Sequence, residues 1–499
     1  MAPPPGRGRA GPTTVHGMSE KKAPEPATLL ILGASGDLAA RLLMPGLGGL
    51  LSIEPPRRVQ LIGAGVEEYT DAEWKARVKT SFDSVHASGP AVDALLESTT
   101  YITADVTGAD GLRGLLEACD APPSIYFALP PAITEKACAA LREVDLPEGT
   151  ALALEKPFGT DLASAKKLNR EVLKLVHEDQ VHRVDHFLGR STVLNLLGLR
   201  FANRLIEPML NNQHVESIEI VYDEELGLEN RARYYDHAGA MVDMIQSHLL
   251  QVMAVLTMNA PATLGAADLR DEKELVLRAT HVWDDDAVAN SRRARYGKGE
   301  VDGRTLPAYV DEDGVDASLE TETLAEVVVE VANWRWAGVP ILLRSGKALA
   351  SRRREIVITF RPPAHVPAEF VGGGTPDRLR IAISPDEMSL ELNVNGPGDA
   401  YDLGRAALHA EFGSSDLTAY GEVLSGILDD DPTLSVRGDT AEQCWRIVDP
   451  VIAAWNAGDV ELDTYPAGSA GPESWPAGAR QNEPAVRAEK TEPASQRPE

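Results

Sequence analysis

The stretch TLLILGASGDLAARLLMPGL, residues 28–47, is typical of a strand, a phosphate-binding turn and a helix in succession. Thr28 to Leu32 form a short apolar run suited to a buried parallel strand. Gly33, Gly36 and the small Ala39 follow in a GxxGxxA pattern, which permits a tight turn and close approach of a pyrophosphate. A glycine turn that binds nothing is the alternative. The stretch favours a nucleotide-binding domain.

The segments that follow continue the alternation of strands and helices. The predicted elements are a strand at 59–62, a helix at 71–82, a strand ending near 104, a strand within SIYFALPP at 124–131 and a strand within ALALEKPFG at 151–159. Such alternation builds a doubly wound parallel sheet. Lys156 stands at the carboxyl end of the last strand, which faces the ligand crevice in sheets of this kind. A solvated lysine is the alternative there.

After about residue 215 the pattern changes to alternating or β-branched runs joined by turns. These runs are SIEIVYDEE, TLAEVVVEVANWRW, PILLRSG, EIVITFRPP, LRIAISP and LELNVN. They predict a large, mostly antiparallel sheet with one face packed on helices. So much apolar strand surface is rarely left in water, so we expect the other face to pair with a second subunit in a homodimer or homotetramer.

Composition limits the classes of function and partner. The 499 residues suffice for two large domains, and a formal charge of −28 disfavours nucleic acid or an anionic membrane as a partner. The chain shows neither a secretory signal nor eighteen consecutive apolar residues, so we expect a cytoplasmic protein. Its three cysteines form no CxxC pair, and we expect neither a disulfide framework nor a metal. Residues 1–27 and 468–499 are predicted to be disordered tails.

Two distant segments, VHRVDHFLGR at 181–190 and DMIQSHLLQ at 243–251, carry a candidate acid–base group. They supply Asp185, His186 and His248. A carboxylate beside an imidazole fixes its tautomer and stabilises the imidazolium, which makes a general base that works near neutral pH. This chemistry suits the removal of a proton from an alcohol. Taken singly, histidines so far apart are more often structural residues.

Several segments together resemble the glucose-6-phosphate dehydrogenase family. They are GASGDLA at 33–39, FALPP at 127–131, EKPFG at 155–159, RVDHFLGR at 183–190, NLLGLRFAN at 195–203, QSHLLQ at 246–251, RDEK at 270–273, NWRWAGVPILLRSGK at 333–347 and WRIVDP at 445–450. Their order and spacing match from about residue 28 to residue 470. The resemblance implies an α/β Rossmann-like NAD(P)-binding domain at 28–185, followed by a larger α+β substrate and dimerisation domain at 186–467.

The resemblance also implies an activity and a set of site residues. The family oxidises glucose 6-phosphate at C1 to 6-phosphoglucono-δ-lactone with NADP or NAD, the first step of the oxidative pentose phosphate pathway. By motif, His248 matches the general base and Asp185 the carboxylate that orients it. The matched substrate contacts are Lys156, His186, Phe187, Arg190, Glu224, Asp243, Lys347 and Arg352. The matched cofactor contacts are Gly33, Ala34, Ser35, Gly36, Asp37, Leu38, Glu67, Pro130 and Lys156.

Three substrate-site positions depart from the family pattern. Phe187 stands where the family usually has tyrosine, so one hydroxyl contact to the phosphate would be lost, at a cost of about 1 kcal/mol. Arg190 replaces a lysine, which keeps the charge but changes its geometry from a point to a fork. Ser247 replaces the asparagine before the catalytic histidine, and its shorter reach is expected to alter how His248 is seated.

The cofactor site departs most. GAGVEEYT at 63–70 places Val66, Glu67 and Glu68 where the family has an arginine for the 2′-phosphate of NADP, and Ala40 replaces a lysine. A carboxylate there accepts hydrogen bonds from a free ribose 2′-hydroxyl and repels a 2′-phosphate. The sequence therefore favours NAD or dual use over strict NADP use. In the alternative, both glutamates face solvent and Arg41, Arg57 or Arg58 contacts the phosphate.

Two other functions compete with this interpretation. A sugar dehydrogenase of the glucose–fructose oxidoreductase type also joins a nucleotide-binding domain to an open sheet and carries an EKP segment. It gives no reason for the DHFLGR and RSGK segments. A paralogue that binds a sugar phosphate without turnover gives no reason to retain both Asp185 and His248.

Overall fold

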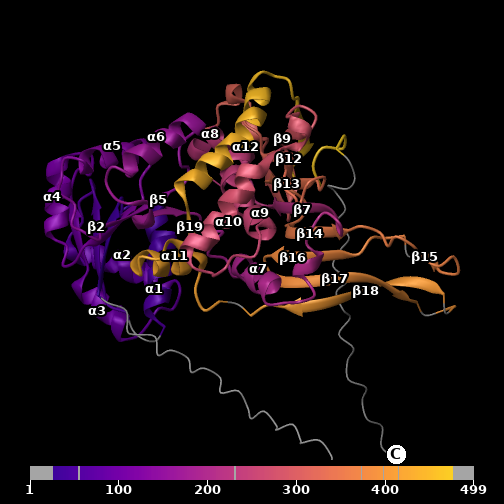
Figure 1. Cartoon of the computed structure of the whole chain (residues 1–499). Coiled ribbons are helices and arrows are strands. Elements are labelled where there is room, and N and C mark those ends of the chain that lie inside the picture. Colours follow the sequence, from indigo (N-terminus) through magenta and orange to yellow (C-terminus); the bar gives the residue numbers. More distant parts are fainter. Residues whose placement is uncertain are drawn as a thin grey trace, which may run out of the picture.

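The computed structural model describes residues 26–53, 57–229, 232–372, 374–396, 398–399, 401–413 and 415–475. Within these ranges the chain forms two sheets, each with its own helices (Figure 1). The tail predicted at 1–27 lies outside the described residues, except for Pro26 and for Ala27, which begins the first strand.

The first sheet has seven strands in the order β19-β6-β5-β4-β1-β2-β3 and is parallel apart from β19. Its strands are β1 (Ala27–Leu32), β2 (Val59–Gly65), β3 (Thr100–Thr103), β4 (Pro123–Phe127), β5 (Ala151–Glu155), β6 (Val181–Val184) and β19 (Ser435–Val436). The predicted parallel, doubly wound sheet is therefore confirmed, and β2 continues beyond the predicted end to Gly65.

Helices cover both faces of this sheet because alternate residues of its buried strands are apolar on both sides. One face packs on α1 (Met44–Leu51), α2 (Asp71–Asp83), α3 (Pro90–Ser98) and α11 (Ala419–Leu428). The other packs on α4 (Ala109–Glu117), α5 (Pro131–Leu141) and α6 (Leu162–Val172).

The chain returns to this first sheet after it has completed most of the second domain. Both α11 and β19 belong to the C-terminal part of the sequence, yet α11 packs on α1 and β19 pairs with β6. Arg57 donates hydrogen bonds of 2.7 and 2.8 Å to Asp429, which directly follows α11, and these bonds attach the C-terminal segment to the first domain. The first structural domain thus contains a segment that a division of the sequence at 185/186 assigns to the second.

The second sheet has eleven strands and is mostly antiparallel, as predicted. Its order is β15-β18-β17-β16-β14-β7-β13-β12-β9-β20, and β8 pairs with β12. The strands are β7 (Val215–Asp223), β8 (Thr280–Val282), β9 (Ser291–Gly297), β12 (Leu324–Val331), β13 (Ile341–Gly346), β14 (Arg354–Phe360), β15 (Val371–Gly372), β16 (Arg378–Ile383), β17 (Asp386–Asn395), β18 (Asp402–Glu411) and β20 (Leu462–Pro466).

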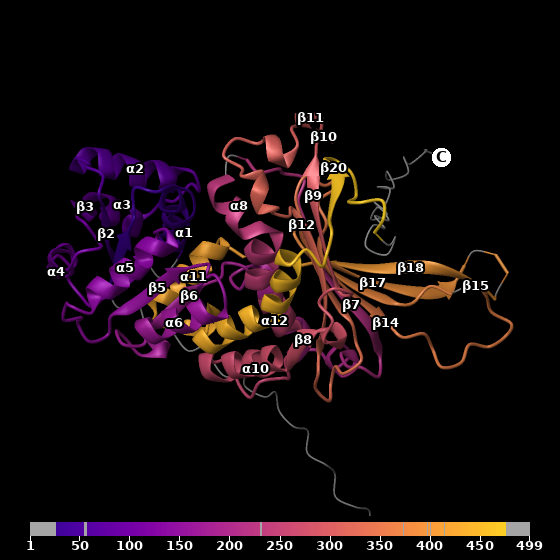
Figure 2. The same ribbon diagram turned by 90° about the horizontal axis from the view of Figure 1, so that it is seen from above.

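Helices between the two sheets bury one face of the second sheet (Figure 2). They are α7 (Ser191–Phe201), α8 (Ala232–Ala240), the wide helical segment η4 (Met241–Leu249), α9 (Leu250–Thr257), α10 (Ala266–Ala279) and α12 (Gly438–Asn456). The run Tyr234–Thr257 is long and apolar enough to cross a membrane, with a mean hydropathy of 1.3. Because 89% of its apolar window is buried in this fold, we interpret it as a core helix.

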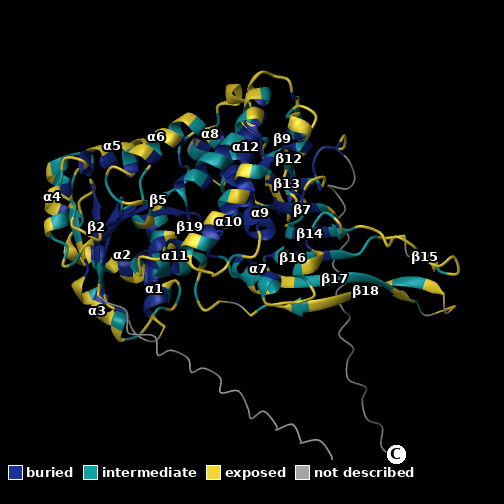
Figure 3. Cartoon of the chain, in the orientation of Figure 1, coloured by how far each residue is buried: buried dark blue, intermediate teal, exposed yellow. Residues whose placement is uncertain are grey.

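The opposite face of the second sheet is more polar than the sequence suggested. Ile218 and Ile220 of β7 point to the helices, so Glu219 points the other way, where it accepts a hydrogen bond from Arg353 at 2.9 Å. The ladder continues across β14, β16 and β17 through Glu355, Arg380 and Glu391. These strands are only partly buried (Figure 3).

Residues 468–475, which the sequence placed in a disordered tail, are ordered in the structure. Residues 468–475 pack on the second domain, where Leu349 bridges to Ser469. Trp475 is 4% exposed and its indole donates to Asp463 at 2.7 Å. Composition misled the prediction because a single tryptophan buries enough apolar surface to hold a short polar segment. Residues 476–499 lie outside the described part of the chain.

We expect Trp475→Ala to lower the free energy of unfolding by about 3 kcal/mol, because it removes a large buried ring and leaves a cavity. The matched control is Trp334→Ala, since Trp334 is 98% exposed. Urea denaturation followed by circular dichroism measures both variants. Equal stability of the two variants would show that the packing of Trp475 contributes nothing.

Candidate active site

The glycine turn lies at the carboxyl ends of β1, β2 and β4. Gly33 has φ +83°, and a Cβ there would lie 2.4 Å from the carbonyl oxygen of Ala128, so only glycine fits. The N–H groups of Gly33 and Ala34 donate to the carbonyl of Ala64 at 2.8 and 3.1 Å. Asp37 and Leu38 then begin the helical run. This narrow turn before a helix N-terminus fits the pyrophosphate of a dinucleotide.

Glu67 points to this turn. Its carboxylate accepts a hydrogen bond of 2.6 Å from the Ser35 hydroxyl, which lowers the pKa of Glu67. Arg77 of α2 donates to the carbonyls of Ser35 and Gly36. Val66 and Glu68 are exposed. A carboxylate, with a guanidinium behind it, therefore lies beside the turn. The sequence analysis did not predict that Arg77 contacts the turn.

The acid–base pair joins the two domains. Asp185 directly follows β6, and its Oδ1 atom accepts from Nδ1 of His248 at 2.5 Å and from the backbone N–H of Phe187 at 2.9 Å. Asp185 and His248 are 2% and 1% exposed. Because a carboxylate only accepts hydrogen bonds, Nδ1 carries the proton and Nε2 keeps its lone pair. The predicted pairing of Asp185 with His248 is thus present in the structure.

Protonation states in this pair suit a general base. Burial lowers the pKa of His248, and the raising effect of Asp185 only partly offsets it. Burial would raise the pKa of Asp185, but the interactions with His248 and His186 reverse this and lower it. At neutral pH the imidazole is therefore neutral and the carboxylate is ionised, as proton abstraction requires.

Aromatic rings surround the imidazole. Phe187 stacks on His248 with centroids 4.2 Å apart, and His186 meets it edge-on at 4.8 Å. Phe187 is 2% exposed, so its ring packs on the base. His186 also stacks on Tyr420 of α11 at 5.4 Å. Burial holds the pKa of His186 well below its ordinary value.

Ligating atoms of Asp185, His186 and His248 lie within 4.8 Å of one another, the one such cluster among the described residues. The contact between Asp185 and His248 has the length of a hydrogen bond, which leaves no room for an ion between these two atoms. We therefore interpret the cluster as acid–base machinery.

Lys156 reaches across the domain boundary to Asp243. Its ammonium donates to the backbone carbonyl and to Oδ1 of Asp243 at 2.6 and 2.9 Å. Burial opposes the charge on Lys156, but Asp243 more than compensates and raises the pKa of the lysine. The Ser247 hydroxyl donates to the same backbone carbonyl at 2.8 Å and makes no hydrogen bond to His248.

A second carboxylate with cations lies at the end of β7. Glu224 accepts from Lys347 at 2.7 Å and from Arg354 at 2.9 Å. Arg352 is exposed, and within the described ranges it makes no hydrogen bond or ion pair. The structure thus groups most of the predicted substrate residues and leaves Arg352 at the surface. Pro130 lies at the carboxyl end of β4, just before α5.

Glu155 and Tyr420 are further residues that the sequence reading did not assign. Burial raises the pKa of Glu155 to about 7, although Tyr126 and Tyr420 donate to it at 2.5 and 3.3 Å. Glu155 directly precedes Lys156 in the EKPFG motif, and this position could have indicated that Glu155 also lies at the site. No local pattern linked Glu155 or Lys156 to Tyr420, because Tyr420, on α11, lies 265 residues beyond Glu155 in the chain.

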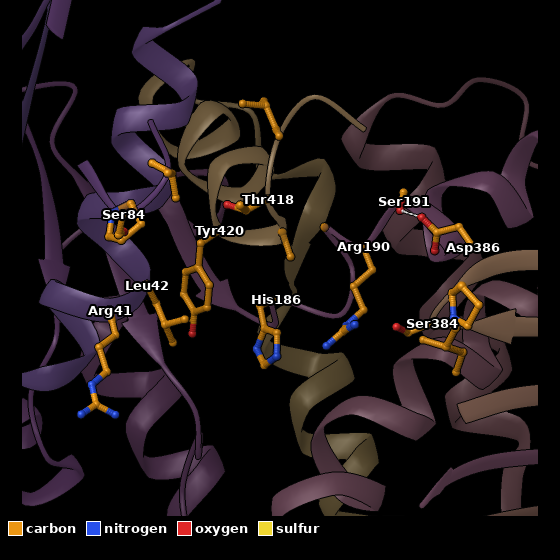
Figure 4. A pocket seen from close by; sticks show the side chains of 17 residues that line it. Arg41, Leu42, Ser84, His186, Arg190, Ser191, Ser384, Asp386, Thr418 and Tyr420 are labelled. Carbon is orange, nitrogen blue, oxygen red and sulfur yellow. Dashed lines mark hydrogen bonds between the residues drawn. The ribbon is translucent and has the colours of Figure 1, made fainter. Parts of the chain in front are cut away.

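A cavity of about 580 Å³ opens beside His186 and Arg190. Figure 4 shows His186, Arg190 and Tyr420 pointing to the same side, with Arg41 on the opposite wall and a hydrogen bond between Ser191 and Asp386 at the edge. Arg190 forms no ion pair among the described residues. An anion with sugar-like dimensions fits such a cavity, because the Arg190 guanidinium and one N–H of the His186 ring can donate to it.

Two domain models of one protein family together match nearly the whole chain. Residues 30–195 match the NAD binding domain of glucose-6-phosphate dehydrogenase, and residues 197–485 match its C-terminal domain. A glucose-6-phosphate 1-dehydrogenase from Zymomonas mobilis is 35% identical over 467 residues, which cover 88% of this chain and 94% of that protein. The sequence similarity extends over both domains.

Solved structures give the same result. A glucose-6-phosphate dehydrogenase in complex with its substrate glucose-6-phosphate has a TM-score of 0.81 at 29% identity, covering 92% of this chain and 97% of that chain. A 3-ketoreductase from Actinomadura kijaniata, 14% identical with a TM-score of 0.50, covers 89% of this chain and 100% of its own, and shares the fold alone.

We expect Lys156→Met to destabilise the fold by about 3 kcal/mol at neutral pH, because it leaves the buried Asp243 carboxylate without its cation. Lys156 lowers the pKa of Asp243, and a lowered folded-state pKa contributes stability that is present above the unfolded value and is lost as pH falls. Without the lysine, burial raises that pKa. The penalty should therefore shrink as pH falls and Asp243 becomes protonated.

Thermal unfolding midpoints at several pH values test this expectation. The double variant Lys156→Met/Asp243→Asn should recover much of the loss. Lys79→Met is the matched control, because Lys79 pairs with Asp83 on an exposed helix face and should change little. A loss that is the same at every pH would contradict the role of Asp243.

Proposed function

The chain belongs to the glucose-6-phosphate dehydrogenase family, and we propose that it oxidises glucose 6-phosphate at C1 to 6-phosphoglucono-δ-lactone with NAD at least as readily as with NADP. The observation that carries the reaction is the 2.5 Å contact between Asp185 and His248 beside a cavity lined by His186 and Arg190. The comparisons do not favour a glucose–fructose oxidoreductase type of activity or a non-catalytic role.

His248 performs the proton transfer. Its Nε2 accepts the proton of the C1 hydroxyl as the hydrogen at C1 leaves with its two electrons, so C1 becomes the carbonyl carbon of the lactone. The bound nicotinamide supplies the hydride acceptor. Asp185 stabilises the imidazolium that forms, because its carboxylate accepts from Nδ1 throughout.

Charged side chains around the base hold the substrate. Arg190, His186 and Arg352 supply cationic or N–H groups for the phosphate dianion, with Arg190 presenting a fork that matches phosphate oxygens. The pairs Lys156–Asp243 and Lys347–Glu224 supply donors and acceptors for sugar hydroxyls. Each ion pair fixes the positions of its two side chains relative to the cavity residues.

The preference for NAD rests on Glu67 and its surroundings. The Ser35 hydroxyl draws the Glu67 carboxylate onto the phosphate turn, where it can accept from a ribose 2′-hydroxyl and repel a 2′-phosphate. Arg57, one alternative source of a phosphate contact, is 8% exposed and bound to Asp429. Arg77 lies close enough to the turn to offset part of the repulsion, which supports dual use rather than exclusion of NADP.

We further propose a cytoplasmic homodimer or homotetramer. The half-buried ion-pair ladder on the open face of the second sheet offers a surface for a second copy. The described cysteines are all unpaired thiols, which agrees with a reducing compartment. Light scattering coupled to gel filtration would measure the oligomer.

We expect His248→Ala to keep the fold, with lower stability because the buried Asp185 loses its partner, and to lose turnover of glucose 6-phosphate by a factor on the order of 10² to 10⁴, because a positioned base contributes that much. Asp185→Asn should also reduce turnover while substrate binding is largely kept, since it disturbs the tautomer. His281→Ala, outside the site, is the control. Absorbance at 340 nm measures all three, and near wild-type turnover of His248→Ala would refute the assignment of the base.

For the cofactor, we expect Val66→Arg with Glu67→Arg to shift the ratio of kcat/KM values toward NADP by about tenfold or more. The change removes a like-charge contact and adds a charge-assisted bond, each worth about 1 kcal/mol. The shift should shrink as salt rises, because this edge is open to solvent. Glu68→Arg is the control, since Glu68 is equally exposed and no hydrogen bond joins it to the described turn.

Strict NADP dependence of the unmodified enzyme, combined with no response to the double substitution, would contradict this assignment. The 2′-phosphate would then be held elsewhere, and Glu67 would only order the turn through Ser35.

A further inference from the structure

Tyr222 lies at the end of β7 against the acid–base cluster. Its ring packs on Phe187 with centroids 5.1 Å apart, and the residue is 4% exposed. The Tyr222 hydroxyl accepts a hydrogen bond of 3.3 Å from Nη2 of Arg190. A buried hydroxyl from the second sheet therefore touches the cation that faces the cavity.

Two guanidinium groups flank the Tyr222 ring. The Cζ atom of Arg354 lies 4.4 Å from the ring centroid, and that of Arg190 lies 5.9 Å from it. Arg354 has Glu224 as its partner, whereas Arg190 has no carboxylate partner within the described residues. Arg190 therefore keeps a positive charge that an anion in the cavity can neutralise.

Unused donors surround the same ring. The buried Nε atoms of Arg190 and Arg354 have no hydrogen-bond partner in the described part of the chain. Burial raises the pKa of Tyr222 even though Arg190 and Arg354 oppose the shift, so the hydroxyl keeps its proton at neutral pH. That O–H has no described acceptor. Buried donors without acceptors are costly, and phosphate oxygens would satisfy them.

Phe187 cannot supply such a donor. Its ring has no hydroxyl, and it fills the space between His248, at 4.2 Å, and the guanidinium of Arg190, at 4.5 Å. The hydroxyl that is hydrogen-bonded to Arg190 comes from a strand of the second sheet, not from the segment that carries Asp185 and His186.

We propose that Tyr222 is a specificity-determining residue for the substrate phosphate: its hydroxyl positions Arg190 and donates a hydrogen bond to a phosphate oxygen, while Arg354, paired with Glu224, packs against the ring. This inference rests on the proposed function. It also explains how the chain manages without a hydroxyl at Phe187.

Tyr222→Phe tests the proposal in the full-length enzyme. The variant removes one oxygen and keeps the ring, so we expect KM and Kd for glucose 6-phosphate to rise by about tenfold or more while kcat changes little, because the phosphate loses a charge-assisted hydrogen bond. KM for unphosphorylated glucose should not change. Tyr296→Phe is the matched control, because Tyr296 is also buried but donates to Glu312 outside the site.

A second substitution separates the phosphate contact from a packing role. Adding Phe187→Tyr to Tyr222→Phe returns a hydroxyl next to Arg190 and should lower the KM for glucose 6-phosphate toward the wild-type value. An equal rise in KM for glucose and glucose 6-phosphate, or no change in either, would overturn the proposal. Calorimetric measurement of Kd for glucose 6-phosphate needs no turnover, so it distinguishes failure of this inference from failure of the proposed reaction.

Discussion

The hydrogen bond between Asp185 and His248 sets the geometry of the whole site, because its two partners belong to different domains. Asp185 ends a strand of the parallel sheet, and His248 lies on the wide helical segment that packs on the antiparallel sheet. Both are almost fully buried, so neither can replace the other by water. Separating the two domains would leave the Asp185 carboxylate buried without its partner, which is unfavourable, so this hydrogen bond stabilises their relative position. Lys156 and Asp243 form a second tie across the same boundary.

The C-terminal return of the chain strengthens this arrangement. Helix α11 carries Tyr420 to the first domain, where its hydroxyl contacts Glu155 and its ring stacks on His186. The Asp429 contact with Arg57 fixes the other end of the same helix. Residues from three separate parts of the sequence thus meet at His186. A relative movement of the domains would break several buried polar contacts together, which favours a site that is preorganised before substrate arrives.

Local patterns in the sequence predicted what depends on near neighbours. The run Thr28–Leu32 specified its strand, and the motif around Asp185 and His248 identified the acid–base pair. Tyr222 lay within a predicted strand, but no pattern could show that Arg190 from another element lies beside it. The same limit hid Tyr420 from Glu155. Composition likewise could not predict that residues 468–475 pack on the second domain. The average polarity of this segment hides the apolar surface that Trp475 alone buries.

Charge compensation determines which cations remain for the substrate phosphate. The chain carries a formal charge of −28, which opposes the approach of a dianionic sugar phosphate at low ionic strength. Lys156 and Lys347 cannot offset this field, because Asp243 and Glu224 already neutralise them. Among the residues that the structure describes, Arg190 has no such carboxylate, and Arg352 is exposed at the surface. The uncompensated positive charge therefore lies with these two arginines, and a neutral donor such as the Tyr222 hydroxyl adds selectivity for the phosphate without bringing a further cation into the buried cluster.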